Sequence, residues 1–311
     1  MNVIDALTPA LCGMFKFEAF RVDENGNEIS RRTVMDWTPN MIVDNGKNLL
    51  GSGGNFLSYI SIGSSNVPPN SGQNALISYI ASTSGTVVNI DGVINTSPYY
   101  SYSIITKRFT AAPTNWTINE VGIGPNNNGT NLFSRALTVD SLGVPTTLNI
   151  LAGEILDVTY QIRCYPPIGS DVTGTITISG VNYNYTLRAC RVGFSPNSGG
   201  GWGSPYQVDA WPVTFSQVVT VFTGSIGDIT SSPSGTTAGV NSGYTDLTYT
   251  PGNFYRDHQI VIDLASGNIT GGIKSIMYNF RWGCYQIEFS TAIPKSASNI
   301  LTLVFRHAWA T

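Results

Sequence analysis

Hydrophobic and polar side chains alternate along most of the chain, and the alternating runs are rich in β-branched and aromatic residues. Because successive side chains of a strand point to opposite faces, this period of two predicts half-buried strands. Clusters of Gly, Asn, Asp and Pro separate the runs, and these residue types favour turns. The predicted strands are 14–22, 58–62, 99–109, 131–138, 147–150, 155–164, 174–179, 183–192, 213–222, 259–264, 275–281, 285–289 and 300–307.

Helical periodicity is scarce in this sequence. Two short segments, 39–50 and 74–81, are the best helix candidates. We expect Pro39 in the first turn of the former, where its missing N–H is not needed for a helical hydrogen bond.

Short strands at this spacing predict β-sandwiches rather than a parallel α/β sheet. A proline pair in segment 165–170 follows a strong strand and should extend the chain. The expected fold is therefore all-β, with two β-sandwich-like domains, long Gly/Asn/Ser-rich loops and little helix. The N-terminal β domain, for assembly or attachment, is expected at 1–167, and the C-terminal β-sandwich domain at 168–311.

The composition indicates a protein surface with few charged residues. Hydrophobic residues make up 41% of the chain, which is enough for a core, but charged residues only 11%, against roughly 25% in an average soluble domain. A neutral polar surface suits burial in an assembly, where each isolated charge would carry a desolvation cost. A net charge of −3 with 16 basic residues argues against binding to nucleic acid.

The start of the chain lacks the pattern of a secretory signal, and no apolar run reaches the ~18 residues of a membrane span. We therefore expect no membrane insertion. Four cysteines, Cys12, Cys164, Cys190 and Cys284, fit no zinc or redox spacing. They are expected to be free and mostly buried thiols of a protein made in a reducing cytoplasm. A disulfide stays open, and the spacing selects no pairing.

Catalytic constellations are missing from the sequence. The two histidines, His258 and His307, belong to no metal-ligand spacing, and both are expected at the surface or at strand edges. No nucleophile elbow or phosphate loop is present. Glu18 and Glu288 fall within strands and should mark solvated faces. We expect no enzymatic activity, no metal and no cofactor. A glycan depolymerase would need distant carboxylates to converge, drawn from Asp5, Glu18, Glu120, Glu154, Asp157, Asp209 and Glu288.

Aromatic residues gather around a glycine-rich stretch at 195–205, which is expected to be a long loop. Trp202, Tyr206 and Trp211 are the candidate contact residues for a partner protein or a glycan, since exposed rings stack on sugars or fill a neighbour's groove. The competing interpretation is that these rings fold back over the end of the sandwich.

Five segments resemble patterns in tailed-bacteriophage virion proteins: 60–69, 116–124, 132–137, 151–160 and 285–306. Together they cover about half of the chain, and 168–250 resembles nothing known to us. The resemblance implies a non-enzymatic structural protein of the virion, made in the host bacterial cytoplasm, with no catalytic residues to carry over.

Within that class the tail is favoured, in its tip, baseplate, adaptor or fibre-attachment region. The expected partners are copies of itself, in a homo-oligomer, and other virion proteins. A capsid decoration or head-fibre protein is one alternative, and a receptor module for host attachment through a surface glycan is another.

Two of these segments also have a direct physical interpretation. Glu120 should sit at a strand end, where its carboxylate accepts turn N–H groups or meets Arg135. Segment 151–154 is predicted to be a tight hairpin turn with Gly153 at positive φ.

Overall fold

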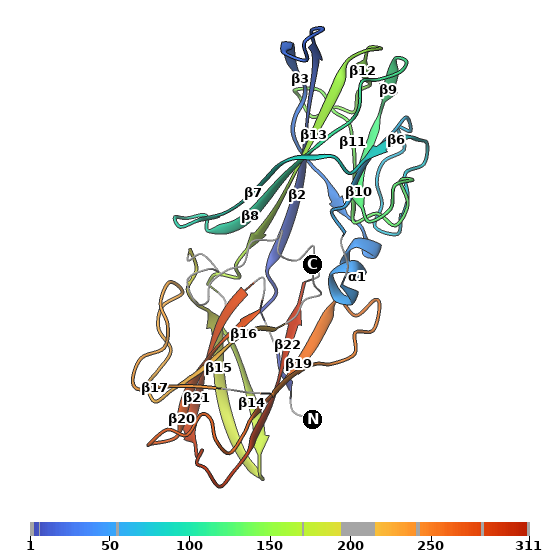
Figure 1. Cartoon of the computed structure of the whole chain (residues 1–311). Coiled ribbons are helices and arrows are strands. Elements are labelled where there is room, and N and C mark those ends of the chain that lie inside the picture. Colours follow the sequence, from blue (N-terminus) through green and yellow to red (C-terminus); the bar gives the residue numbers. More distant parts are fainter. Residues whose placement is uncertain are drawn as a thin grey trace.

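The structure is a computed structural model that describes residues 3–5, 7–53, 56–169, 171–193, 215–240, 243–280 and 283–309. It is nearly all β, with the single helix α1 (Asp44–Ser52) in the described part of the chain, as the alternating pattern predicts. Figure 1 shows an elongated molecule with two β-rich regions and α1 between them.

The first region consists of two five-stranded sheets and a two-stranded one. One sheet has the order β3-β2-β13-β8-β7, and the other has the order β4-β11-β10-β5-β6. Hydrogen bonds from Asn40 to Ser134 of β11 and to Tyr160 of β13 link the two five-stranded sheets. The strands are β2 (Ala10–Val22), β3 (Glu28–Pro39), β4 (Met41–Ile42), β5 (Tyr59–Gly63), β6 (Tyr79–Thr83), β7 (Thr86–Ile94), β8 (Tyr100–Arg108), β9 (Trp116–Ile118), β10 (Glu120–Gly124), β11 (Ser134–Leu137), β12 (Leu148–Ile150) and β13 (Ile155–Tyr165).

The second region pairs a six-stranded sheet, β14-β15-β21-β20-β16-β17, with a four-stranded sheet, β1-β22-β19-β18. Tyr278 of β20 and Phe305 of β22 have ring centroids 4.1 Å apart, so the two sheets pack face to face. The strands are β1 (Val3–Ile4), β14 (Val172–Ile178), β15 (Val181–Ala189), β16 (Phe215–Phe222), β17 (Thr237–Gly239), β18 (Gly243–Asp246), β19 (Tyr255–Ile262), β20 (Ile273–Phe280), β21 (Gly283–Ile293) and β22 (Leu301–Ala308).

Every predicted strand overlaps an observed one, but several strands lack the alternating signal. β3 carries charged side chains and is exposed over its first half, and β7 is exposed along most of its length. With neither face fully buried, these strands need no alternation of hydrophobic and polar residues.

The helix predictions need correction. Pro39 does not open a helix, because it ends β3 opposite Met14, on the outermost strand of its sheet, where a missing N–H breaks no ladder. Segment 74–81 is not helical either, and its end enters β6. The described helix begins only at Asp44, whose carboxylate lies in the positive first turn.

The turn at 151–154 is confirmed in part. Gly153 has φ +80°, and the N–H of Glu154 donates to the carbonyl of Leu151 at 2.9 Å. It is not a hairpin, however, because β12 pairs with β9 while β13 pairs with β2 and β8. The turn instead carries the chain from one sheet to another.

Strand β1 bears on the expected division of the chain. It pairs in parallel with β22, so the first described residues belong to a sheet of the second region. The expected boundary at 167 falls between the end of β13 and the start of β14, and the division into 1–167 and 168–311 stays a prediction.

Candidate functional site

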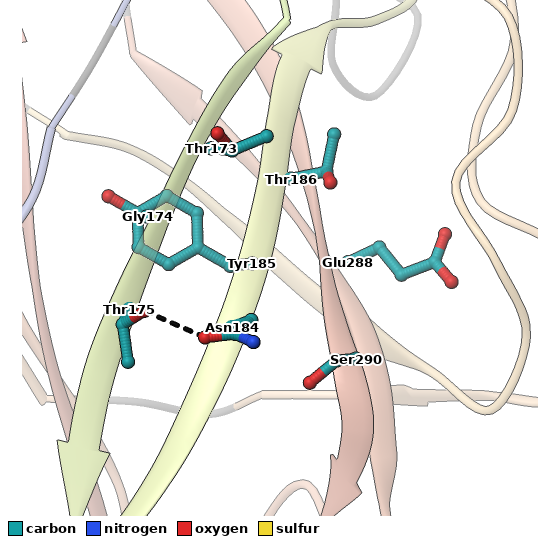
Figure 2. Close-up of a pocket in the computed structure, with 8 residues that line it drawn as sticks. All are labelled: Thr173, Gly174, Thr175, Asn184, Tyr185, Thr186, Glu288 and Ser290. Carbon is teal, nitrogen blue, oxygen red and sulfur yellow. Dashed lines mark hydrogen bonds between the residues drawn. The ribbon is translucent and has the colours of Figure 1, made fainter.

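The aromatic residues predicted as contacts, Trp202, Tyr206 and Trp211, lie outside the described residues. The site that the structure does describe is an open groove of about 430 Å³ on the outer face of β14, β15 and β21. Figure 2 shows the eight lining residues, which are Thr173, Gly174, Thr175, Asn184, Tyr185, Thr186, Glu288 and Ser290.

Strand alternation accounts for the polar character of this face. On β15, Tyr183, Tyr185 and Leu187 are buried on the inner face, whereas the residues between them point outward. Because neighbouring strands are in register, Asn184 lies opposite Thr175 and Thr186 lies opposite Glu288. Hydroxyl, amide and carboxylate groups from three strands therefore share one surface.

Cross-strand hydrogen bonds order part of the groove. The hydroxyl of Thr175 donates to Oδ1 of Asn184 at 2.7 Å, and the hydroxyl of Thr177 donates to Oδ1 of Asn182 at 2.7 Å. Figure 2 shows the amide nitrogen of Asn184 on the side that faces Ser290. The Thr–Asn pairs thus hold amide donors at regular spacing along the face.

Glu288 contributes the negative charge of the groove. Burial raises the pKa of its carboxyl. Hydrogen bonds from Lys274, the N–H of Ile226 and the hydroxyl of Ser225 together lower this pKa by more than burial raises it, so the net shift is downward. Lys274 Nζ lies 3.1 Å from its Oε1. The carboxylate is therefore ionised and partly neutralised at neutral pH, and it is half-buried on the outer face, as expected for this strand residue.

The lining is rich in hydrogen-bonding groups. Glu288 is the single carboxylate among the described residues that line the groove, whereas glycoside hydrolysis ordinarily uses two. Neutral donors and acceptors on a wide, shallow surface match a ligand rich in hydroxyl groups, such as a saccharide.

A second polar cluster, around Glu120, connects strands and a long loop. Arg135 of β11 donates through Nε to Oε2 of Glu120 at 2.8 Å, and neither side chain has exposed surface. Glu120 also accepts the N–H groups of Ile77 and Ser78, at 3.2 and 2.8 Å. The predicted role of Glu120, accepting turn N–H groups and meeting Arg135, is confirmed.

The same arginine also fastens the loop that follows β5. Its Nη1 donates to Gln73 at 2.9 Å, and its Nη2 donates to the carbonyl of Val67 at 2.8 Å. β5, β10 and β11 are neighbours in one sheet, so segments 60–69, 116–124 and 132–137 meet at this ion pair. The cluster therefore links β10, β11 and the loop after β5.

Both histidines contradict the expectation of a surface position, because neither side chain is exposed. His258 Nδ1 lies 2.7 Å from Oδ1 of Asp246. Burial lowers the pKa of His258, and burial together with the neighbouring His258 lowers the pKa of His307 to about 3. The period-two pattern Leu303, Phe305, His307 was the signal that placed His307 on the inner face of β22.

Among the described residues no group of three potential ligands of the His, Cys, Asp or Glu type gathers into a metal site. The single described helix is too short to cross a membrane.

The chain matches no protein-family model. No curated protein and no solved structure matches it either. Function must therefore be inferred from the residues and their arrangement.

Proposed function

We propose that this chain is a non-enzymatic structural component of the tail of a tailed-phage virion, where it assembles with copies of itself and docks on other virion proteins. The observation that carries the proposal is the exposed edge strand β7. The resemblance of five segments to virion proteins supplies the phage context.

Strand β7 has the properties of an assembly edge. It ends the sheet β3-β2-β13-β8-β7, so its outer backbone groups pair with no other described strand. Val87, Val88 and Ile90 are exposed, Ile90 to 50%. Figure 1 shows β7 and β8 together on one side of the molecule. Soluble proteins commonly protect such edges with Lys, Pro or a covering loop.

Among the described residues, no strand pairs with this edge, and the strand itself carries no such protection. Residues 86–94 contain neither Lys nor Pro, and their single charge, Asp91, accepts a hydrogen bond from Ser103 at 2.6 Å. An unblocked edge of β-branched residues is a template for pairing with another strand. The low charge of the whole chain supports the same proposal, because a surface buried in an assembly carries few isolated charges.

The test is the copy number of the protein in purified particles, measured by mass spectrometry against the major capsid protein. A low count, in small multiples of three or six, supports the tail. Hundreds of copies would replace the tail with capsid decoration, and absence from the particle would overturn the structural role.

Binding of a host-surface glycan is a second candidate function, favoured by the groove on β14, β15 and β21. Replacing Asn184 by Ala removes an ordered amide from the groove without touching the core, since Asn184 is exposed. Loss of adsorption with intact particle assembly supports this candidate. The pair Trp202→Ala and Trp211→Ala tests the aromatic segment separately, and unchanged adsorption in both experiments removes glycan binding.

A further inference from the structure

Cys190 and Cys284 lie directly across from each other on neighbouring strands. Ala189, the last residue of β15, is opposite Tyr285 of β21, and in this antiparallel register the residue after Ala189 lies opposite the residue before Tyr285. The N–H of Cys190 donates to the carbonyl of Cys284 at 2.8 Å, and the two Sγ atoms are 3.0 Å apart. Both side chains are fully buried.

This placement meets the geometric requirements of a disulfide. Opposed residues of antiparallel strands have Cα atoms about 4.5–5.5 Å apart, within the range of about 4.4–6.8 Å that disulfides span. The sulfur atoms need to approach by about 1 Å to reach bonding distance. Side-chain rotation supplies that movement, and the strands need not shift.

The other two cysteines are not arranged in this way. Cys12 lies opposite Arg163, and Cys164 lies opposite Leu11 on the same pair of strands. Adjacent positions of a strand point to opposite faces of the sheet, so Cys12, which is half-buried, and Cys164, which is buried, face away from each other.

We propose that Cys190 and Cys284 form an intramolecular disulfide once the protein meets dioxygen outside a reducing cytoplasm. The two thiols lose two protons and two electrons as the S–S bond forms, and dioxygen takes them up to give hydrogen peroxide. This inference does not depend on the function proposed above.

Burial affects when this reaction takes place. It raises the pKa of the Cys190 thiol, and hydrogen bonding to Cys284 raises it further. Because the thiolate is the reactive species, oxidation of the folded protein is slow, and opening motions or alkaline pH accelerate it. Once formed, the bond is shielded from reductants.

The cross-link has a mechanical consequence for the second region. It joins β15 to β21 and closes a loop from 190 to 284, which contains β16, β17, β18, β19 and β20. Closing a long loop restricts the unfolded chain and thereby stabilises the folded one. The second region becomes harder to unfold after oxidation, while its folded geometry stays the same.

Peptide mapping tests the inference on the full-length wild-type chain. The protein is held in air-saturated buffer at pH 8, then denatured in guanidinium chloride near neutral pH with excess N-ethylmaleimide, and after removal of the denaturant it is digested with trypsin without reductant. Cleavage at Arg and Lys places Cys190 in peptide 189–191 and Cys284 in peptide 282–295. We expect these two peptides as one linked species, lighter by two hydrogens than their sum, and maleimide on Cys12 and Cys164.

Stability provides a second measurement. Oxidised protein that is unfolded, reduced and refolded with reductant present should have a Tm lower by roughly 5–10 °C, and the variant Cys12→Ser should show the same loss as the wild type. Labelling of all four thiols after oxidation, or a link that involves Cys12 or Cys164, would overturn the proposal.

Discussion

Glu120 and Arg135 form an ion pair with no exposed side-chain surface. Two buried charges are tolerated here because each is saturated, the carboxylate by Arg135 and two backbone N–H groups and the guanidinium by Glu120, Gln73 and the carbonyl of Val67. Removal of one charge would leave the other charge buried without an ion-pair partner.

Replacing Glu120 by Gln should therefore destabilise the fold by about 3–5 kcal/mol. The N–H groups of Ile77 and Ser78 should also exchange faster with solvent, because they lose a charged acceptor. Urea denaturation and hydrogen exchange measure the two effects.

Glu28→Gln is the matched control, since Glu28 pairs with Arg31 at the surface and should change stability little. A double variant, Glu120→Gln with Arg135→Met, should recover part of the loss. If Glu120→Gln changes the free energy of unfolding as little as Glu28→Gln does, the buried ion pair does not hold the loop that follows β5.

His307 makes stability depend on pH. Its pKa is about 3 in the folded protein and 6.5 in the reference state. Above pH 6.5 the imidazole is neutral in both states and contributes no pH dependence. As pH falls below 6.5, the unfolded chain takes up the proton and the folded chain does not, so the free energy of unfolding decreases.

Between pH 7.5 and 5.0 this histidine should account for a loss of about 2 kcal/mol. Urea midpoints at the two pH values should differ less in His307→Gln than in the wild type. An equal difference in both proteins would show that His307 does not titrate between the folded and unfolded states in this window.

At the scale of elements, α1 fits between the two regions because two of its residues are glycines. A Cβ on Gly46 would lie 2.0 Å from the carbonyl oxygen of Phe133, and a Cβ on Gly51 would lie 2.4 Å from the ring of Tyr249. On the same helix, Asn48 accepts hydrogen bonds from Tyr249 and from the N–H of Gly252. The helix thus contacts the first region on one side and the second on the other.

The variant Gly46→Ala should be destabilising, by several kcal/mol, although Ala favours a helix by about 1 kcal/mol over Gly. The added methyl group would collide with the backbone of Phe133, which cannot move aside as a flexible side chain could. Ser52→Ala at the exposed end of α1 is the control and should be close to neutral. A Tm of Gly46→Ala at or above that of the wild type would contradict this packing.

For the whole molecule, the edge of β7 predicts self-association. A lysine at position 90 places a charge in the middle of the exposed strand, which is a common protection against edge pairing. We expect Ile90→Lys to weaken self-association at least tenfold, as measured by sedimentation velocity over a range of concentrations.

Leu142→Lys is the matched control, because Leu142 is 85% exposed in a turn and lies outside every sheet. Self-association that survives Ile90→Lys, or that Leu142→Lys weakens equally, would move the assembly surface away from β7.

The sequence by itself determined the fold class and most of the strands, because alternation of hydrophobic and polar residues is a local property of a half-buried strand. It also determined the positive φ of Gly153 and the meeting of Glu120 with Arg135, whose segments are close in the chain. β7 and the first half of β3 escaped prediction because stretches exposed on both faces carry no alternation.

Only the tertiary structure decided which strands are neighbours. It placed β1 beside β22, about 300 residues later, and turned His258 and His307 into the interior. It also brought Cys190 opposite Cys284 and lined the outer groove with residues of β14, β15 and β21. The physical reason is that a strand's own residues specify which face is buried, whereas its partner and register depend on the packing of all other strands.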